Sequence, residues 1–341
     1  MNHKLFVPTL LILAALTLAN CTLPSVSISQ PTATPVPSTP TANVTPPPPT
    51  AELGLAENPL ILALAPSGNA PEQINAAREI ASQFMERTGY VVVTIAPDSY
   101  VELIDALENG NAHIVLLDPL SYALAYQKDL VRAQFAVVQD GGKIKYGAQF
   151  LAPRKSGFIS YFDNDAGENT ASTDIALAQF NDKKPCWSEE TSPSGYVIPL
   201  GLLNQAQVQT RPAAFVGGQT TVVRSLYLGG ICDFGATYVD ARKFPSLENE
   251  YPDLVEQVVV IWRVPEIIPY EVLVFSTKMP QNMRDLFGNI IPAVIQTDSG
   301  NAAFKSAYDI DALQSVNDGD FKEFHILVDE SRIDLFPIIN K

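Results

Sequence analysis

Hydroxyl and amide side chains gather in three short loops that each precede a predicted helix. The loops are Ser67-Gly68-Asn69, Asp118-Pro119-Leu120-Ser121 and Thr191-Ser192-Pro193-Ser194-Gly195. Taken singly, each loop is explained by helix capping, since Ser, Thr, Asn and Asp are favoured at helix starts. If several of them meet at one cleft, their hydroxyl donors, free backbone N–H groups and positive helix ends together favour an anion. The residues therefore indicate a site for a phosphate-like group that needs no basic side chain.

The charge balance restricts the partners of the chain. Its 341 residues include 22 Lys and Arg against 37 Asp and Glu, a formal net charge of -15. Nucleic acids and anionic lipid surfaces both require a basic protein surface, so we expect neither as a partner. The chain has only 3 His and 3 Cys residues, which argues against a His-rich metal centre. We expect no metal and no cofactor.

Signatures of enzymes are absent from the sequence. It contains no HExxH, no Walker loop, no GxGxxG after a strand and no GxSxG elbow. His113 lies inside an apolar strand pattern and His325 in the C-terminal tail, and both are interpreted as structural. If the chain were an enzyme, Asp233 with Tyr238 would be its acid–base candidates. We therefore expect a binding protein and no catalytic residues.

The loops must be positioned by regular elements, and the hydrophobic periodicity predicts alternating strands and helices from about residue 55 onward. Expected strands lie at 59–65, 90–95 and 112–117, and expected helices at 71–88, 100–108 and 122–127. A second set has helices at 191–203, after an entering loop, and 220–228, strands at 231–237, 258–262 and 272–276, and a helical C-terminal region. This alternation predicts an α/β fold with a parallel sheet covered by helices.

The first 54 residues predict export and anchoring. An apolar run at 5–18 is too short to span a bilayer as a helix and is typical of a signal peptide, here 1–20; an uncleaved membrane anchor is the alternative. The sequence Leu18-Ala19-Asn20-Cys21 resembles the bacterial lipobox, apart from Asn20, and implies lipidation of Cys21. Residues 21–54 then form a Pro- and Thr-rich tether.

Segments spread through most of the remaining chain resemble one family. They are 62–72, 100–107, 109–122, 191–202, 228–241 and 268–280. They are similar to the PhnD-like phosphate, phosphite and phosphonate-binding proteins of ABC importers. The most specific piece is Ser192-Pro193-Ser194-Gly195-Tyr196 with Pro199. The resemblance implies a type II periplasmic-binding-protein fold, with lobe 1 formed by 55–150 plus 265–341 and lobe 2 by 151–264. We expect the ligand cleft between the lobes, and hinges near 147–154 and 263–269.

The resemblance also implies a set of ligand contacts. These are Ser67, Asn69, Tyr100, Pro119, Ser121, Tyr122, Ser192, Ser194, Gly195 and Asp233. Tyr100 and Tyr122 also fit as core aromatics with a solvated hydroxyl. Pro193 replaces a Thr of the family pattern, and Gln219 and Thr220 stand where His and an acidic residue are usual. An acid there would suit a ligand amine, so its loss weakens the case for an aminoalkylphosphonate.

The remaining expectations concern the pairing of the cysteines and the binding partners of the protein. Cys186 and Cys232 are an even pair that can form a disulfide outside the cytoplasm, although spacing alone leaves this open. The leading hypothesis is an extracytoplasmic lipoprotein that captures a small phosphorus oxyanion, works as a monomer and delivers its ligand to an ABC permease of the inner membrane. It would contact the membrane through the lipid anchor only. The alternative is a sensory module that presents a small anion to a membrane receptor.

Overall fold

The computed structural model describes residues 51–66, 70–139 and 141–340. All of them belong to one of two compact units, Thr50–Lys341. The predicted signal peptide, Cys21, nearly all of the tether, Ser67 and Asn69 therefore lie outside the described residues. Within the described residues, no helix is long and apolar enough to cross a membrane. The same residues contain no cluster of His, Cys, Asp or Glu arranged to hold a metal.

The first sheet has six strands in the order β15-β4-β14-β3-β1-β2. Its strands are β1 (Leu60–Ala63), β2 (Val92–Ile95), β3 (Ile114–Leu117), β4 (Val131–Val137), β14 (Val272–Ser276) and β15 (Leu313–Ser315). β1 pairs in parallel with β2 and β3, whereas β14 runs antiparallel to both β3 and β4. Every residue of β3 and β14 is buried, because helices cover both faces of the sheet.

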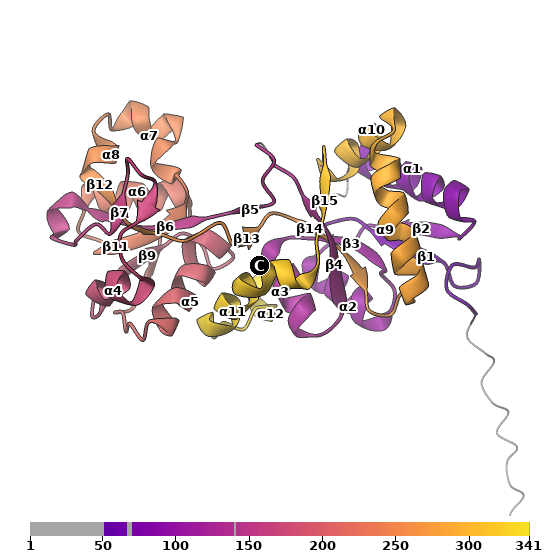
Figure 1. Ribbon diagram of the computed structural model, residues 1–341, viewed down its shortest axis with the longest axis horizontal. Coiled ribbons are helices and arrows are strands. Elements are labelled where there is room, and N and C mark those ends of the chain that lie inside the picture. The colour runs from indigo at the N-terminus through magenta and orange to yellow at the C-terminus, as the bar shows by residue number, and fades with distance from the viewer. Residues whose placement is uncertain (1–50, 67–69, 140, 341) are drawn as a thin grey trace, which may run out of the picture. The chain divides into compact units, whose positions relative to one another are not determined.

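Helices connect and cover these strands, as the periodicity predicts. They are α1 (Pro71–Thr88), α2 (Tyr100–Asn109), α3 (Pro119–Gln127), α9 (Gln281–Ile295) and α10 (Asp298–Tyr308). In Figure 1, α1, α9 and α10 lie together on one side of the sheet. α3 begins earlier than expected, at Pro119, because the Asp118 carboxylate accepts hydrogen bonds from the N–H groups of Leu120 and Ser121.

The second sheet has five strands in the order β10-β9-β11-β6-β12. These are β6 (Ala148–Pro153), β9 (Pro185–Trp187), β10 (Ala214–Phe215), β11 (Phe234–Tyr238) and β12 (Val258–Arg263), with a small hairpin of β7 (Phe162–Asp163) and β8 (Glu168–Asn169). The helices of this part are α4 (Thr173–Leu177), α5 (Ile198–Gln205), α6 (Gln219–Leu228), α7 (Pro245–Glu250) and α8 (Leu254–Gln257). β9 is parallel to β10 and β11, so their carboxyl ends reach one edge of the sheet.

Two extended segments connect the sheets. β5 (Lys145–Tyr146) carries the chain from the first sheet to the second, and β13 (Ile268–Pro269) carries it back. The two pair antiparallel with each other, and Figure 1 shows them between the two sheets. Beside them the backbones come very close, because a Cβ built on Gly147 would lie 2.6 Å from the carbonyl oxygen of Val264. Bending at these segments, near the expected hinges, stays a prediction.

The C-terminal helices connect back to both parts of the fold. α11 (Lys322–Ser331) packs against α5 although it follows the first sheet in sequence. The contact is at the backbone, since a Cβ on Gly201 would lie 2.0 Å from the carbonyl oxygen of Leu327. The Asn204 side-chain amide also donates to the carbonyl of Glu330 at 2.8 Å. α12 (Phe336–Ile339) contacts α2 and α3 instead. Residues 265–341 thus do not all pack with the first sheet.

The two histidines singled out in the sequence lie in the interior. His113 accepts a hydrogen bond at Nδ1 from the Ile61 N–H at 3.1 Å, and burial lowers its pKa to about 4. His325 is stacked on Tyr126 with ring centroids 3.9 Å apart, and burial lowers its pKa to about 4 as well. Both rings are therefore neutral at neutral pH and pack as core side chains.

Candidate functional site

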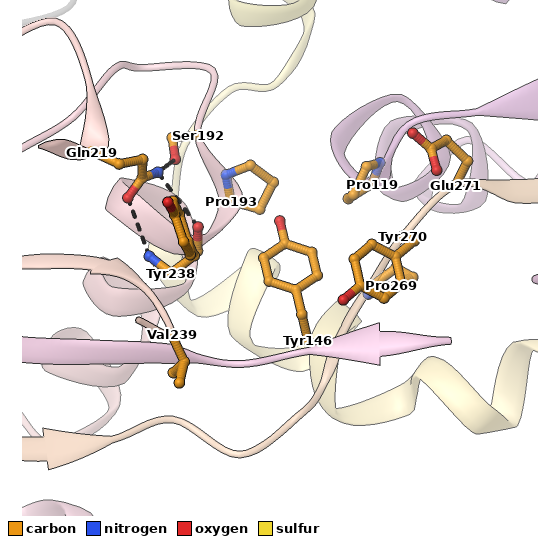
Figure 2. Close-up of a pocket in the computed structure, with 11 residues that line it drawn as sticks. Pro119, Tyr146, Ser192, Pro193, Gln219, Tyr238, Val239, Pro269, Tyr270 and Glu271 are labelled. Atoms are coloured by element: carbon orange, nitrogen blue, oxygen red, sulfur yellow. Dashed lines mark hydrogen bonds between the residues drawn. The ribbon is translucent and has the colours of Figure 1, made fainter. Parts of the chain in front are cut away.

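A cavity of about 410 Å³ lies where the strand ends of both sheets meet the two connecting segments. It is lined by Pro119, Tyr146, Ser192, Pro193, Ser194, Gln219, Tyr238, Val239, Pro269, Tyr270 and Glu271. Figure 2 shows the polar groups of Ser192, Gln219 and Tyr238 on one side and Pro119, Tyr270 and Glu271 on the other. Pro119 follows β3, while Tyr238 ends β11, so the cavity lies at strand ends as expected for an α/β fold.

Hydrogen bonds hold the loop before α5 in its conformation at this cavity. Ser192 caps the following turn, because its Oγ accepts a hydrogen bond from the Gly195 N–H at 2.9 Å. Pro193 occupies the first position of the Pro193–Val197 turn, where its fixed φ and missing N–H are tolerated. The capping interpretation of Ser192 is therefore correct, and it does not exclude a second role for the same hydroxyl.

Gln219 holds the hydroxyls of this loop in place. Its Nε2 donates to Ser192 Oγ at 2.8 Å and lies 3.4 Å from Ser188 Oγ and 3.5 Å from Ser194 Oγ. Its Oε1 accepts from the Tyr238 N–H at 3.1 Å, which fixes the orientation of the amide. Ser192 Oγ thus accepts two hydrogen bonds, from Gly195 and Gln219. Because both lone pairs are used, the O–H of Ser192 is left for a further acceptor, and this residue lines the cavity.

Gly195 allows these groups to come together. A Cβ at this position would lie 2.0 Å from Ser188 Oγ and 2.9 Å from Gln219 Nε2. Gly195 is predicted as a ligand contact, but it is not among the residues that line either cavity, and its N–H already donates to Ser192 Oγ. Its role in the structure is steric.

Tyrosines form the wall between the two polar sides. Tyr146 and Tyr270 come from the paired connecting segments and stack with ring centroids 5.1 Å apart. Burial is the largest cause that raises the pKa of Tyr146, and a hydrogen bond with Ser194 acts in the opposite direction. Burial also raises the pKa of Tyr238, with a smaller contribution from the charge of Asp240. The phenols are therefore neutral hydrogen-bonding groups at neutral pH.

A second cavity of about 370 Å³ adjoins the first and shares Pro119, Tyr146 and Pro193 with it. Its other lining residues are Tyr100, Asp118, Leu120, Thr191, Ile338 and Ile339. Burial, followed by the charges of Asp118 and Glu271, raises the pKa of Tyr100. The structure thus brings four of the predicted contacts, Tyr100, Pro119, Ser192 and Ser194, to these two cavities.

Ser121 and Tyr122 lie elsewhere. The Ser121 hydroxyl is buried and donates to the Asp118 carboxylate at 2.5 Å, so it stabilises the start of α3. Tyr122 is fully buried; its hydroxyl donates to Asp318 at 2.9 Å, and its ring contacts Phe321 and His325. Neither Ser121 nor Tyr122 lines either cavity. The burial of Tyr122 fits the alternative interpretation of a core aromatic.

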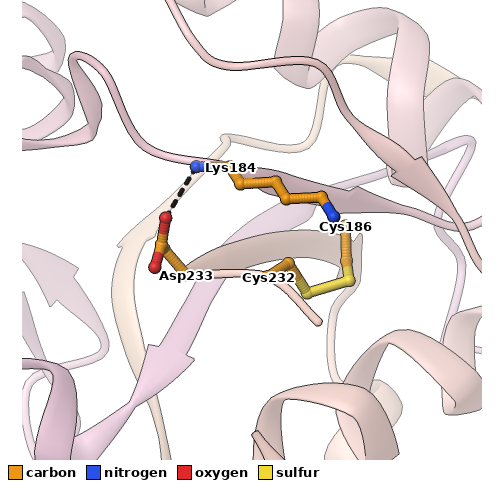
Figure 3. Close-up of a disulfide and its surroundings, with 4 residues drawn as sticks. All are labelled: Lys184, Cys186, Cys232 and Asp233. Atoms are coloured by element: carbon orange, nitrogen blue, oxygen red, sulfur yellow. Dashed lines mark hydrogen bonds between the residues drawn. A yellow bond between two sulfur atoms is a disulfide. The ribbon is translucent and has the colours of Figure 1, made fainter. Parts of the chain in front are cut away.

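Asp233 also lies away from the cavities. Its carboxylate accepts a hydrogen bond from the Lys184 N–H at 2.8 Å, beside the disulfide between Cys186 and Cys232 (Figure 3). It precedes β11, whereas Tyr238 ends that strand. They are five positions apart along the strand, a separation of about 16 Å, too far for a joint acid–base role.

The disulfide joins two neighbouring strands of the second sheet. Cys186 lies in β9 and Cys232 just before β11, with Cα atoms 5.6 Å apart, within the normal range for a disulfide. The residues that the bond encloses include the Ser192–Gly195 loop and Gln219.

Several cavity residues are missed by reasoning from the sequence. Gln219 is noted there only as a departure from a family pattern, and Tyr238 only as an acid–base candidate. Tyr146, Tyr270 and Glu271 are not singled out, because they lie in or beside short connecting segments without a hydrophobic period. Their one signal is position, since Tyr146, Tyr270 and Glu271 lie within two residues of the expected hinges at 147–154 and 263–269.

Known proteins were compared with this chain. The model of the family described as "ABC transporter, phosphonate, periplasmic substrate-binding protein" matches residues 62–321. No curated protein matches the chain. Among solved structures, the chain is similar to XAC2383 from Xanthomonas citri bound to chloride, with 15% identity, a TM-score of 0.57, and coverage of 80% of this chain and 97% of that one. The same protein bound to ATP matches with 14% identity and a TM-score of 0.57, covering 80% and 96%.

PhnD1 from Prochlorococcus marinus in complex with methylphosphonate is also similar, with 15% identity, a TM-score of 0.46, and coverage of 79% and 96%. At these identities solved structures bear on the fold alone. The α/β fold predicted for a type II periplasmic binding protein is confirmed by the family match and agrees with the two XAC2383 structures at a TM-score of 0.57. The family match covers most of the chain. The chain belongs to the family of periplasmic phosphonate-binding proteins, the substrate-binding components of ABC transporters.

Proposed function

We propose that this protein captures a small phosphorus oxyanion (a phosphonate, phosphite or phosphate) in the cavity between the two sheets and delivers it to an ABC permease. The observation that carries the proposal is the state of the Ser192 hydroxyl. Its oxygen accepts from both Gly195 and Gln219, so its O–H is available to a further acceptor. An oxyanion is the acceptor that suits a preorganised donor best.

The surroundings of Ser192 support an anion bound by neutral groups. Ser194 lies on the same loop, Tyr146 faces it from a connecting segment, and α5 follows directly, so the positive helix end adds to the hydroxyl donors. No Lys or Arg is among the described residues that line this cavity. Release to a permease is easier from a site that binds through dipoles than from one with full countercharges.

Closure around the ligand is the proposed mechanism. The two connecting segments would bend and bring Pro119 and Glu271 toward Ser192 and Ser194, so that the closed form is the one a permease recognises. We assign ligand contacts to Ser192 and Ser194, with Tyr100, Tyr146 and Pro119 as walls and Gly195 as the residue that makes room.

A thermal-shift screen tests this function directly. The purified full chain in detergent is heated with phosphate, phosphite, methylphosphonate, 2-aminoethylphosphonate or sulfate. A ligand at 100 times its dissociation constant is expected to stabilise the native state by about 2.7 kcal/mol. We expect a shift with at least one phosphorus oxyanion, because the cavity offers several oriented donors.

The same screen on variants assigns the site. Ser194→Ala is expected to abolish the shift, while Ser246→Ala, an exposed serine on α7, leaves it unchanged. If no phosphorus oxyanion shifts the wild type, or if Ser194→Ala responds like the wild type, the proposed site is wrong.

We further propose that the mature protein is anchored outside the cytoplasm by lipid on Cys21. The support is the signal-like start, the lipobox resemblance and the Pro-rich stretch that follows. In a bacterial host fed an alkyne-labelled fatty acid, the wild type is expected to take up label and to sediment with membranes. Cys21→Ala should lose the label, and label uptake by that variant would contradict the proposal.

A further inference from the structure

A third cavity, of about 310 Å³, lies beside both connections between the sheets. It is lined by Gly147, directly after β5, and by Val264, between β12 and β13. The β7–β8 hairpin and Arg263, the last residue of β12, form further parts of its wall. The third cavity shares Val239 with the first cavity but none of its serines or tyrosines. In the described part of the chain, Arg263 is the one Lys or Arg that lines any of these three cavities.

The β7–β8 hairpin holds Arg263 in place. The Asn169 side-chain amide donates to the Arg263 carbonyl at 2.8 Å and accepts from the Arg263 N–H at 2.9 Å. The guanidinium carbon lies 4.2 Å from the centroid of the Phe162 ring, the arrangement of a cation–π contact. Both the backbone and the guanidinium of Arg263 are therefore positioned before any ligand arrives, which lowers the entropic cost of binding.

The guanidinium of Arg263 has unused hydrogen-bond donors. It carries five N–H groups, and none of them donates to an acceptor among the residues that the structure describes. Its Nε is buried without a partner, while the side chain as a whole is 28% exposed. The Asp240 carboxylate oxygen lies 3.9 Å from Nη2, too far for a hydrogen bond. An acceptor that enters the cavity therefore finds donors that no described group has taken.

The neighbouring acidic groups are engaged with other cations. The Asp240 carboxylate accepts from Nε and Nη2 of the buried Arg242, at 2.9 Å and 2.6 Å. Glu266, which also lines the third cavity, forms an ion pair with Lys143. Burial is the largest cause that lowers the pKa of Arg263; the charge of Asp240 acts in the opposite direction, and the charge of Arg242 lowers this pKa further. The lining thus contains one cationic group without a hydrogen-bonded counterion.

We propose that the third cavity is a second anion site, in which the Arg263 guanidinium binds a small carboxylate. The planar guanidinium presents parallel N–H groups that match the two oxygens of a carboxylate. A monoanion suits a single guanidinium, because the Glu266 charge in the same lining repels a dianion more strongly. The site is separate from the proposed function and does not depend on it. By linkage, bending of the connecting segments that alters this cavity alters its affinity for the carboxylate, and the bound carboxylate acts on the bending in return.

A matched pair of probes tests the site by fluorine NMR on the full chain in detergent, at constant ionic strength. Fluoroacetate and fluoroacetamide have nearly the same shape, but only fluoroacetate is charged. The wild type is expected to broaden the fluoroacetate signal and to bind the amide at least about tenfold more weakly. Arg263→Gln is expected to weaken fluoroacetate binding about 10- to 100-fold, the usual value of hydrogen bonds to a charged group. Arg263→Lys keeps the charge but loses the planar fork, so a loss of about three- to tenfold is expected.

Two further variants separate the third cavity from other places where an anion could bind. Arg78→Gln removes an exposed arginine of α1 and is expected to bind fluoroacetate like the wild type. Ser194→Ala, which changes the lining of the first cavity but not of the third, is expected to do the same. Loss of binding in Ser194→Ala would place fluoroacetate in the first cavity and overturn the proposal.

Three other outcomes also overturn the proposal. They are no binding by the wild type, equal binding of the amide, and wild-type affinity in Arg263→Gln. Circular dichroism without a probe shows whether each variant is folded. Should Arg263→Gln not fold, Arg263→Lys decides, and an affinity within about twofold of the wild type rejects the site.

Discussion

Gly195→Ala is expected to reduce the affinity for a phosphorus oxyanion by about 100-fold or more while the protein stays folded. The added methyl would lie 2.0 Å from Ser188 Oγ and 2.9 Å from Gln219 Nε2, so both side chains must move. Gln219 then leaves Ser192, and at least two oriented donors are lost. Hydrogen bonds to a charged group contribute about 1.5–3 kcal/mol each, and a factor of 100 corresponds to about 2.7 kcal/mol. Titration calorimetry with the ligand found in the screen measures the loss.

A second substitution checks that the effect is steric. Ser188→Gly removes both Ser188 atoms that the new methyl would meet, so the double variant Gly195→Ala with Ser188→Gly is expected to recover part of the affinity. Gly288→Ala, in α9, is the matched control, because its Cβ would meet only the Gln134 side-chain amide at 3.1 Å. An affinity of Gly195→Ala within about threefold of the wild type would show that the loop adapts, and the described geometry would not explain binding.

Loss of the disulfide is expected to lower the free energy of unfolding by about 4 kcal/mol. The bond closes a loop with a sequence separation of 46, and the chain-entropy model assigns about 4 kcal/mol to a loop of that size. This is a large share of the 5–15 kcal/mol typical of a whole protein. Guanidinium denaturation of the wild type and of the double variant Cys186→Ala with Cys232→Ala gives the difference.

Reduction provides the control for this experiment. A reductant should destabilise the wild type by a similar amount and leave the double variant unchanged, since that variant has no bond to lose. A difference below about 1 kcal/mol between the oxidised wild type and the double variant would mean that the strands β9 and β11 hold the loop without the bond.

The regular elements near the site could be predicted because their signals are local. The expected helix at 71–88 matches α1, and the expected strand at 272–276 matches β14. The strand expected at 231–237 begins later, at Phe234, because Gly229 and Gly230 have positive φ and Cys232 is fixed by its disulfide. β4 carries a strand signal that the expected elements above do not include, since Val131, Ala133 and Phe135 alternate with two polar residues. The two-residue strands β5 and β13 are too short to show a period.

The candidate site could be predicted only where the residues that form a local sequence pattern are also the residues that line the cavity. The Ser192–Gly195 loop is such a case, since capping and anion binding use the same residue types. The orientation of the Tyr122 side chain could not be predicted in this way, because its hydroxyl is hydrogen-bonded to Asp318, 196 positions away in the sequence. Glu271 and Tyr146 reach the cavity through the pairing of β5 with β13, a contact that no local pattern reports.

The contact between α5 and α11 has a consequence for how related chains can diverge. Position 201 has no room for any side chain while the carbonyl of Leu327 lies against it. A relative with a larger residue at this place must therefore hold its last helix farther out, and α12, which follows it, must then approach the second cavity differently. The residue at the place of Gly201 thus indicates whether the C-terminal helices of a relative can pack in this way beside the second cavity.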